Sequence, residues 1–207
     1  MNRQGIVFVV AAPSGAGKSS LVNALLQQDP RLSLSISYTT RPMRPGDIDG
    51  VQYHFVDNRV FEKMIATDQF FEHALVFNHQ YGTARSSIFT VLDQGQDVIM
   101  EIDWQGAKAV RQALSNVCSI FILPPSMEAL QLRLEQRGQD SPAVIKERLC
   151  GAQAEIAHYQ EFDYLVVNED FNQALQQMSQ IIAVARLSRQ QQQHKHAALL
   201  DHLLQNV

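Results

Sequence analysis

The sequence predicts an α/β fold built on a doubly wound, mostly parallel β-sheet. Short apolar runs typical of strands covered on both faces recur along the chain, and helical patterns separate them. The first such run leads through a glycine-rich turn directly into a helix pattern. The 207 residues, with 45% hydrophobic content, suit one compact domain with room for inserts.

The core elements follow in order along the chain. The run GIVFVVAAP predicts the first strand, and apolar residues at helical spacing predict a helix over residues 19–28 that ends near Pro30. Further buried strands are predicted at residues 97–102, 117–123 and 164–167, with helices at residues 105–114, 127–137 and from Asp170 onward. We therefore assign residues 1–34, 87–125 and 158–207 to the core.

Two stretches interrupt this alternation. Residues 35–86 mix short alternating runs (36–39, 51–56 and 70–77) with turns, which predicts a small antiparallel-rich insert. Residues 126–157 are helical and arginine-bearing and are broken by RGQDSP, which predicts a hinged helical hairpin. The tail from Gln190, a glutamine run followed by the helical pattern HAALLDHLL, fits self-association into a homo-oligomer and a helix docked on its own domain equally well.

Charge and composition narrow the function classes. A net charge of −4 and a pI near 5.9 provide no broad positive field, so we expect no nucleic-acid partner and only local phosphate binding. The apolar stretch from Ile6 to Ala12 is too short for a signal sequence or a membrane span, and we expect a cytoplasmic protein with no membrane partner. Cys118 and Cys150 are expected to be buried, reduced thiols.

The turn after the first strand has the pattern of a phosphate-binding loop. Gly15 and Gly17 let successive backbone N–H groups point inward, and the helix that follows adds its positive dipole end. Lys18 can reach the β- and γ-phosphates of a nucleotide, and the Ser19 hydroxyl can bind Mg²⁺ directly or through water. The alternative is a glycine-rich turn that only caps a helix. The predicted loop comprises Ala12, where the usual pattern has glycine, with Pro13, Ser14, Gly15, Ala16, Gly17, Lys18 and Ser19.

Two arginines in the insert suggest a second phosphate site. Arg41 and Arg44 each precede a proline, which favours extended or polyproline II geometry. Because polyproline II repeats every three residues, the two guanidinium groups can project to the same side and hold a dianionic phosphate. Two solvated surface arginines are the alternative, and taken alone they are the commoner case.

The chain resembles guanylate kinases of the bacterial type over nearly its whole length. The resemblance is carried by the loop segment APSGAGKSSL, by residues 37–46, and by QYGT, EIDWQGA and LEQRGQDS. The resemblance implies a P-loop nucleoside monophosphate kinase fold with a parallel core sheet, an antiparallel-rich GMP-binding insert and a helical lid. It also implies Mg²⁺-dependent transfer of the ATP γ-phosphoryl group to GMP and dGMP, in purine nucleotide metabolism.

The resemblance assigns GMP-binding residues in the insert. Glu72 would accept hydrogen bonds from N1–H and N2–H of guanine, whereas adenine has no N1–H to donate. Without the resemblance, Glu72 reads as the polar face of a strand. The implied phosphate ligands are Arg41, Arg44, Tyr53 and Tyr81, and the implied guanine contacts are Ser37, Glu72 and Thr83.

Further implied residues follow the insert. Glu101 and Asp103 stand at the end of a predicted strand, where their spacing places both carboxylates on one face. The resemblance implies that Glu101 assists guanine recognition, although many relatives carry aspartate there, and that Asp103 lies near the phosphates and Mg²⁺. The implied donor-side residues are Arg133 and Arg137 of the lid, Arg148, which also faces GMP, and Asn168 near adenine; the implied catalytic residues are Lys18, Arg41, Asp103, Arg137 and Arg148.

Two other functions remain open from the sequence. One is a guanylate-kinase-like interaction module that binds peptides without catalysis, against which Lys18, Arg41 and Arg44 argue. The other is a P-loop kinase for a different small acceptor, against which Glu72 argues. Glu155 and His158 have the spacing of metal ligands but lack further partners, so we interpret them as a helix-surface pair.

Overall fold

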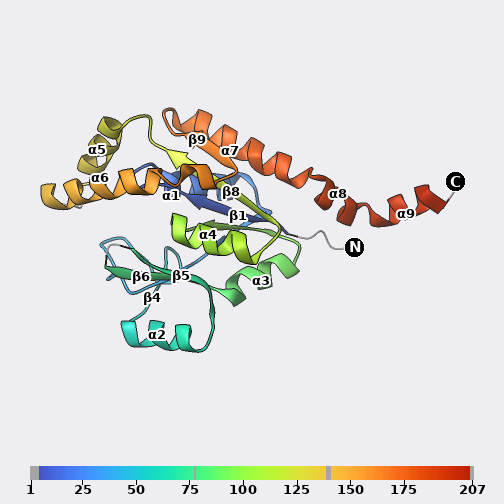
Figure 1. The fold of residues 1–207 in the computed structure, drawn as a ribbon, viewed down its shortest axis with the longest axis horizontal. Coiled ribbons are helices and arrows are strands. Elements are labelled where there is room, and N and C mark those ends of the chain that lie inside the picture. The colour runs from blue at the N-terminus through green and yellow to red at the C-terminus, as the bar shows by residue number, and fades with distance from the viewer. Residues whose placement is uncertain (1–4, 77, 139–140, 206–207) are drawn as a thin grey trace.

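A five-stranded parallel sheet forms the centre of the computed structural model, which describes residues 5–76, 78–138 and 141–205 (Figure 1). Its strand order is β2-β7-β1-β8-β9, and every neighbouring pair is parallel. The predicted parallel core is therefore confirmed, and β2 is a strand that the sequence analysis missed. The strands are β1 (Val7–Ala11), β2 (Leu32–Ser35), β7 (Asp97–Glu101), β8 (Val117–Leu123) and β9 (Tyr164–Val167).

Helices cover both faces of this sheet, as the doubly wound prediction requires. Alternate residues of β1 point to opposite faces: Phe8 and Val10 pack with α1 and α7, whereas Val7 and Val9 pack with α3 and α4. Each face is a separate apolar cluster, and together they bury all of β1. The helices are α1 (Lys18–Gln28), α3 (Arg85–Asp93), α4 (Trp104–Ala113) and α7 (Phe171–Arg186).

A second, four-stranded sheet lies within the predicted insert, in the order β4-β3-β6-β5. The β3–β6 and β5–β6 pairs are antiparallel and the β3–β4 pair is parallel. A helix that the sequence analysis missed, α2, packs Phe61 and Met64 against Phe70 of the sheet. Phe77, at the end of a predicted run, lies outside the described residues. The elements are β3 (Tyr38–Thr39), β4 (His54–Phe55), α2 (Asn58–Ala66), β5 (Phe70–Val76) and β6 (His79–Ala84).

The helical hairpin after β8 consists of α5 (Met127–Gln136) and α6 (Pro142–Ile156). The side chains of Ser126 and Ser141 cap the two helices, and Leu130 and Leu134 of α5 pack with Ile145 and Ala152 of α6. The break in RGQDSP includes residues 139 and 140, which lie outside the described part of the chain. The division into core, insert and lid stays a prediction.

The C-terminal tail continues past α7 as α8 (Arg189–Lys195) and α9 (Ala197–Gln205). Figure 1 shows these helices beyond the end of the sheet, away from α5 and α6, and no described residue of α9 is buried. Among the described residues, no helix has both the length and the apolar character to span a membrane. Both cysteines are free; Cys118 is buried as expected, whereas Cys150 is exposed on α6, contrary to expectation.

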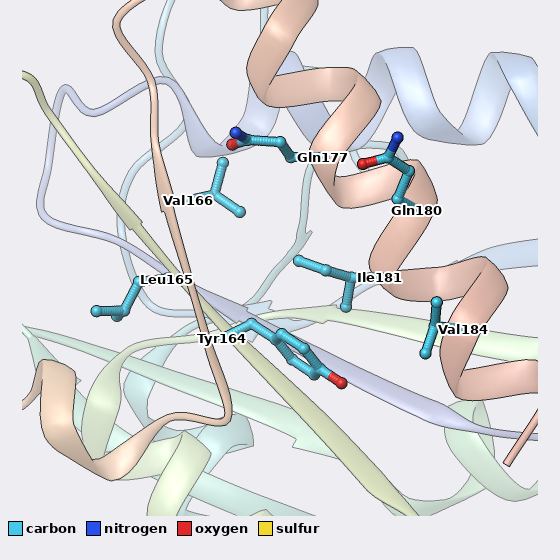
Figure 2. A pocket seen from close by; sticks show the side chains of 7 residues that line it. All are labelled: Tyr164, Leu165, Val166, Gln177, Gln180, Ile181 and Val184. Atoms are coloured by element: carbon cyan, nitrogen blue, oxygen red, sulfur yellow. The ribbon is translucent and has the colours of Figure 1, made fainter.

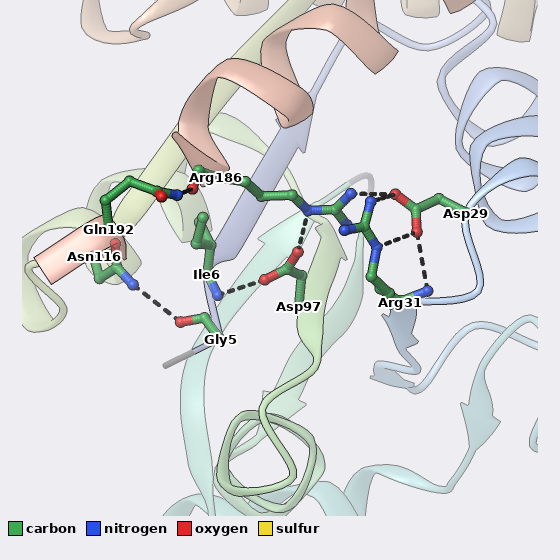
Figure 3. A network of polar contacts seen from close by, with 8 residues as sticks. All are labelled: Gly5, Ile6, Asp29, Arg31, Asp97, Asn116, Arg186 and Gln192. Atoms are coloured by element: carbon green, nitrogen blue, oxygen red, sulfur yellow. Dashed lines mark hydrogen bonds and ion pairs between the residues drawn. The ribbon is translucent and has the colours of Figure 1, made fainter. Parts of the chain in front are cut away.

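A buried polar network holds the sheet at the edge where its strands begin (Figure 3). Arg186, near the end of α7, donates from Nε to Asp97 Oδ2 at 2.7 Å and from Nη1 to Asp29, which follows α1. The other oxygen of Asp97 accepts from the Ile6 N–H at 2.9 Å. The network ties α1 and α7 to β7 and to the start of β1. It leaves the opposite edge, where parallel strands end, for a functional site.

Candidate active site

A cavity of about 570 Å³ lies where β1 and β7 end, between the insert and the α5–α6 hairpin. Most of the predicted site residues line it. The three that do not are Ala16, Thr83 and Asn168, which are all buried. The predicted residues on its wall are Ala12, Pro13, Ser14, Gly15, Gly17, Lys18, Ser19, Ser37, Arg41, Arg44, Tyr53, Glu72, Tyr81, Glu101, Asp103, Arg133, Arg137 and Arg148.

The loop between β1 and α1 has a backbone that requires glycine. Gly15 and Gly17 have φ angles of 95° and 96°, in the left-handed region that other residues rarely adopt. A Cβ atom on Gly17 would also lie 2.3 Å from Nδ2 of Asn168, which donates to the Ala16 carbonyl at 2.7 Å. Asn168 therefore holds the backbone of the loop in place through Ala16. Its predicted contact with adenine stays a prediction.

The first residues of α1 connect this loop to the end of β7. Lys18 Nζ donates to the Ile102 carbonyl at 3.3 Å, and the Ser19 hydroxyl donates to Glu101 Oε2 at 2.7 Å. Glu101 thus lies against Ser19 in this structure, and its guanine contact stays a prediction. The Lys18 ammonium, the Ser19 hydroxyl and the Glu101 carboxylate therefore all lie beside the N-terminus of α1.

Asp103 is held differently from what its spacing predicted. Because β7 ends at Glu101, Asp103 is not on the strand; it is the N-cap of α4, and its Oδ1 accepts from the Gly106 N–H at 2.9 Å. The prediction of two carboxylates on one strand face was therefore wrong, although both side chains line the cavity. A helix cap, and not strand alternation, aims this carboxylate.

A buried chain of polar side chains forms the insert side of the cavity. Glu72 Oε1 accepts from the Thr83 hydroxyl at 2.6 Å, and that hydroxyl lies 3.0 Å from the Ser37 hydroxyl. Burial raises the pKa of Glu72 to about 7, opposed by the Thr83 hydrogen bond and reinforced by Asp103. A Cβ on Gly106 would lie 2.6 Å from Glu72 Oε2, so the glycine of EIDWQGA makes room for this carboxylate. The sequence analysis missed that role.

The two predicted phosphate arginines share one carboxylate. Arg41 Nη2 and the Arg44 backbone N–H each donate to Asp47 Oδ2 at 2.8 Å. The Arg41 guanidinium also lies over the rings of Tyr53 and Phe55, at 5.6 and 5.4 Å from their centroids. Both arginines line the cavity, and so does Asp47, which the sequence analysis did not single out.

Tyr53 and Tyr81 complete this part of the wall. Their rings meet edge to face, with centroids 5.6 Å apart. Burial raises the pKa of Tyr53 to about 12, with further upward contributions from Tyr81 and Glu101. The Tyr53 phenol therefore stays protonated at neutral pH and can donate a hydrogen bond to an anion.

The arginines of the α5–α6 hairpin reach the glycine loop from its other side. Arg133 donates to the carbonyls of Ala16 and Asn168, at 3.4 and 2.7 Å, and Arg148 Nη1 donates to the Ser14 hydroxyl at 3.3 Å. Arg137, the C-cap of α5, also lines the cavity. Two of the three predicted lid arginines, Arg133 and Arg148, thus contact the loop, and all three line the cavity.

The interpretation of Glu155 and His158 as a surface pair was wrong. Glu155 lines the cavity, whereas His158 stacks on Trp104 with ring centroids 3.5 Å apart and lies 2.6 Å from the Glu161 carboxylate. The available signal was the seven-residue spacing from Arg148, which puts Glu155 on the same face of α6. Within the described ranges, no cluster of three or more His, Cys, Asp or Glu side chains could hold a metal ion.

A smaller hollow of about 280 Å³ lies between β9 and α7 (Figure 2). In Figure 2, Tyr164 and Val166 of the strand face Ile181 of the helix. None of the lining side chains carries a charge, so this hollow is unsuited to a phosphate. Its lining residues are Tyr164, Leu165, Val166, Gln177, Gln180, Ile181 and Val184.

Comparisons with known proteins show the family of this chain. The family model "Guanylate kinase" matches residues 4–185. A guanylate kinase of Alkalilimnicola ehrlichii is 54% identical over 200 residues, covering 97% of this chain and 98% of the relative. One of Thiobacillus denitrificans is 52% identical over 195 residues, covering 94% of this chain and 93% of the relative.

A solved structure shows the same fold. The crystal structure of guanylate kinase from Anaplasma phagocytophilum superposes with a TM-score of 0.76 at 33% sequence identity, and the match covers 91% of this chain and 90% of that one. The predicted fold class is confirmed by this likeness, by the parallel sheet and by the family model. By sequence over nearly its full length and by structure, the chain belongs to the guanylate kinase family.

Proposed function

We propose that this protein is a guanylate kinase that transfers the γ-phosphoryl group of ATP to GMP, and also to dGMP, in purine nucleotide metabolism. One observation carries the proposal. A single cavity is lined both by a glycine loop with Lys18 and by the buried carboxylate of Glu72. The first suits a nucleoside triphosphate and the second suits guanine, so the two substrates of the reaction have separate places in one cavity.

The donor phosphates would lie in the loop. Its inward N–H groups and the N-terminus of α1 favour anions, and Lys18 adds a point charge that can follow the γ-phosphoryl group during transfer. Arg137 and Arg148 line the same cavity and can neutralise charge on the transferring group. An oxygen of the GMP phosphate attacks the γ-phosphorus in line, the bond to the β-phosphate oxygen breaks, and ADP leaves.

The acceptor would be held by the insert. Arg41 and Arg44 present two guanidinium groups, and Tyr53 and Tyr81 two phenols, to a monophosphate dianion. Glu72, supported by Thr83, would accept both donor groups on the Watson–Crick edge of guanine. Adenine would leave a desolvated carboxylate without a donor, and such mismatches can cost several powers of ten in kcat/KM.

The side chains beside the loop fit a magnesium ion. The Ser19 hydroxyl and the Glu101 carboxylate are hard oxygen donors 2.7 Å apart, and Mg²⁺ commonly takes one or two protein oxygens, with phosphates and water completing its shell. We propose that Ser19 contacts the ion directly or through water, with Asp103 nearby. When bound, the ion would neutralise charge on the donor phosphates and on the transferring phosphoryl group.

The hairpin of α5 and α6 would serve as the lid. Its arginines already contact the loop through Ser14 and Ala16. Closure over both nucleotides would exclude water and suppress hydrolysis of ATP. We retain residues 35–86 as the GMP-binding insert and residues 126–157 as the lid on this basis.

The proposal also includes a cytoplasmic location, where ATP and GMP are available, and a homo-oligomer formed through the tail.

The test is an acceptor competition. Purified protein with Mg²⁺ and ATP is given GMP, dGMP, AMP, CMP or UMP, and ADP release is measured at matched concentrations. We expect kcat/KM for GMP to exceed that for the other ribonucleotides by at least about a hundredfold, since the buried carboxylate rejects bases that lack its donors. Equal rates with all four ribonucleotides contradict the specificity, and no transfer to GMP contradicts the function and favours an interaction module.

A further inference from the structure

Glu155 is one of the acidic side chains that line the cavity, with Asp47, Glu72, Glu101 and Asp103. Glu155 on α6 follows Arg148 by seven residues, nearly two full helical turns, so both face the cavity from the same side of the helix. Arg148 reaches the glycine loop through Ser14. Glu155 would repel bound phosphates unless a cation lies beside it, so its place on this wall calls for a positive partner.

The electrostatics of the site point to Lys18 as that partner. Burial raises the pKa of Glu155 to about 7, and the charges that act on it are Lys18, which lowers the pKa, and Asp103, which raises it. Lys18 Nζ donates to the Ile102 carbonyl at 3.3 Å, a bond that uses one of its three N–H donors. Lys18 and Glu155 line the same cavity, so the Glu155 carboxylate can attract this ammonium and direct its remaining donors.

The end of α6 that carries Glu155 is fixed to the core. His158, three residues further on, stacks on Trp104 with an interplanar angle of 6° and lies 2.6 Å from Glu161. Trp104 directly follows Asp103, the cap of α4 that also lines the cavity. Glu155 therefore lies within one helical turn of His158, which is anchored on Trp104. Arg148 lies two turns further from this anchor, toward the start of α6.

We propose that Glu155 is a positioning residue for phosphoryl transfer, which attracts the Lys18 ammonium and holds it along the line between the donor and acceptor phosphates. The inference rests on the proposed kinase function. A lysine is a point charge on a flexible four-carbon stem, so its value in a transition state depends on where its ammonium is held. Glu155 supplies the opposing charge that arginines on the lid cannot provide.

The first test compares two substitutions on the same helix. Glu155→Gln removes the charge from the cavity with little change in shape, and Glu147→Gln removes the same charge from an exposed position on α6. We expect Glu155→Gln to lower kcat about tenfold while KM for ATP and for GMP stays within about twofold, since a positioning contact acts mainly in the transition state. Glu147→Gln should match the wild type. An unchanged kcat in Glu155→Gln overturns the proposal.

A double-mutant cycle tests whether the effect passes through Lys18. If it does, Glu155→Gln should cause no further loss of kcat in the Lys18→Ala background, because the group it positions is already gone. Losses that multiply would overturn the assignment to Lys18. Calorimetric affinity for ATP should stay within about twofold in Glu155→Gln, as KM does, and circular dichroism shows that each variant is folded.

The controls separate this inference from the proposed function. If wild type and Glu147→Gln both fail to phosphorylate GMP, the kinase proposal fails and the inference fails with it. If both are active and Glu155→Gln is equally active, the inference alone fails. Glu155→Asp keeps the charge on a shorter side chain, so its kcat should lie between those of Glu155→Gln and the wild type. If kcat of Glu155→Asp is no higher than that of Glu155→Ala, the charge has no role.

Discussion

The core sheet and the small sheet of the insert bury different kinds of side chain. β1 is buried along its whole length by apolar residues that alternate between two helix layers. The insert instead buries Ser37, Thr39, Arg41, Glu72 and Thr83, which bind one another or the backbone. The core therefore gains most of its stability from apolar area, whereas the insert combines a small apolar cluster around Phe61 and Phe70 with buried polar groups that prepare a binding surface.

This difference separates the two halves of the proposed reaction. The donor half depends on backbone geometry, in the glycine loop and the first turn of α1, and its main side chain is Lys18. The acceptor half depends on side chains from β3, β5 and β6 that meet only in the folded insert. Substitutions on the donor side should thus change the rate of transfer, and those on the acceptor side should change which acceptor binds and at what pH.

The largest effect is expected at Lys18. Among the described residues, Lys18 is the one lysine on the cavity wall, and Lys18→Ala should lower kcat by roughly a hundred- to a thousandfold, the usual loss for one preorganised electrostatic donor. KM for GMP should change little, because Arg41 and Arg44 remain. Lys63→Ala, an exposed change in the last turn of α2, is the control in the steady-state assay. Near-normal turnover in folded Lys18→Ala would break the assignment of the donor half.

The next effect concerns recognition of the base by Glu72. Because burial raises its pKa to about 7, the carboxylate form that would accept from guanine appears only as the pH rises through that value. Guanosine has no ionisable phosphate, so its affinity should rise about tenfold for each unit of pH below 7 and level off above it. Calorimetric titration of the wild type and of Glu72→Gln measures this.

Glu72→Gln should bind guanosine weakly, with no such pH dependence. Glu62→Gln, an exposed carboxyl on α2, should reproduce the wild-type profile. A pH-independent affinity in the wild type would mean that Glu72 does not contact the base as an anion.

The same carboxyl should make the free protein less stable at high pH. Its pKa is about 7 in the folded state against an ordinary value of 4.5, so its protonated form stabilises the fold fully below pH 4.5 and that contribution is lost as the pH rises through 7. Glu72→Gln stays neutral and should raise the free energy of unfolding by roughly 2 kcal/mol at pH 8, with little gain at pH 4.5. Thermal denaturation at both pH values checks the sign; a destabilised Glu72→Gln at pH 8 contradicts it.

The fold was predictable where apolar patterns were strong. β8 and β9 have the predicted bounds because continuous apolar runs mark strands covered on both faces. β2 was missed because its sequence LSLS has two serines and only two large apolar residues. α3 was missed because Ile88, Phe89 and Val91 favour a strand as readily as a helix. α2 carried a usable signal, an Asp57 cap followed by Phe61 and Met64, inside a region interpreted as strands and turns.

The site was predictable where it depends on neighbours in sequence. The glycine loop and Lys18 form one short segment, so their chemistry can be read directly. Arg41 and Glu72 gained their assignment only through the family resemblance, because their burial and partners arise from distant strands. Asp47 was missed because a loop carboxylate carries no local sign that it will bind Arg41, and Glu155 was missed because its seven-residue spacing from Arg148 was not used.

The smallest effect is expected at Asp47, and it tests how far the acceptor half is prepared before substrate arrives. Its carboxylate holds Arg41 and the Arg44 N–H in the ligand-free protein, but it also lies on the cavity wall, where it repels a phosphate dianion and competes for Arg41. Asp47→Asn keeps an acceptor for the Arg44 N–H and removes the charge. KM for GMP should therefore fall two- to threefold, on the order of 0.5 kcal/mol, with kcat unchanged.

Asp93→Asn, the same change at an exposed position at the end of α3, should leave KM unaltered. The fall in KM should shrink at high salt, because screening weakens the repulsion that Asp47 exerts. A rise in KM for Asp47→Asn would instead mean that holding Arg41 in place matters more than releasing it. The buried polar side chains of the insert would then serve mainly to hold its structure rigid, as the apolar side chains do in the core.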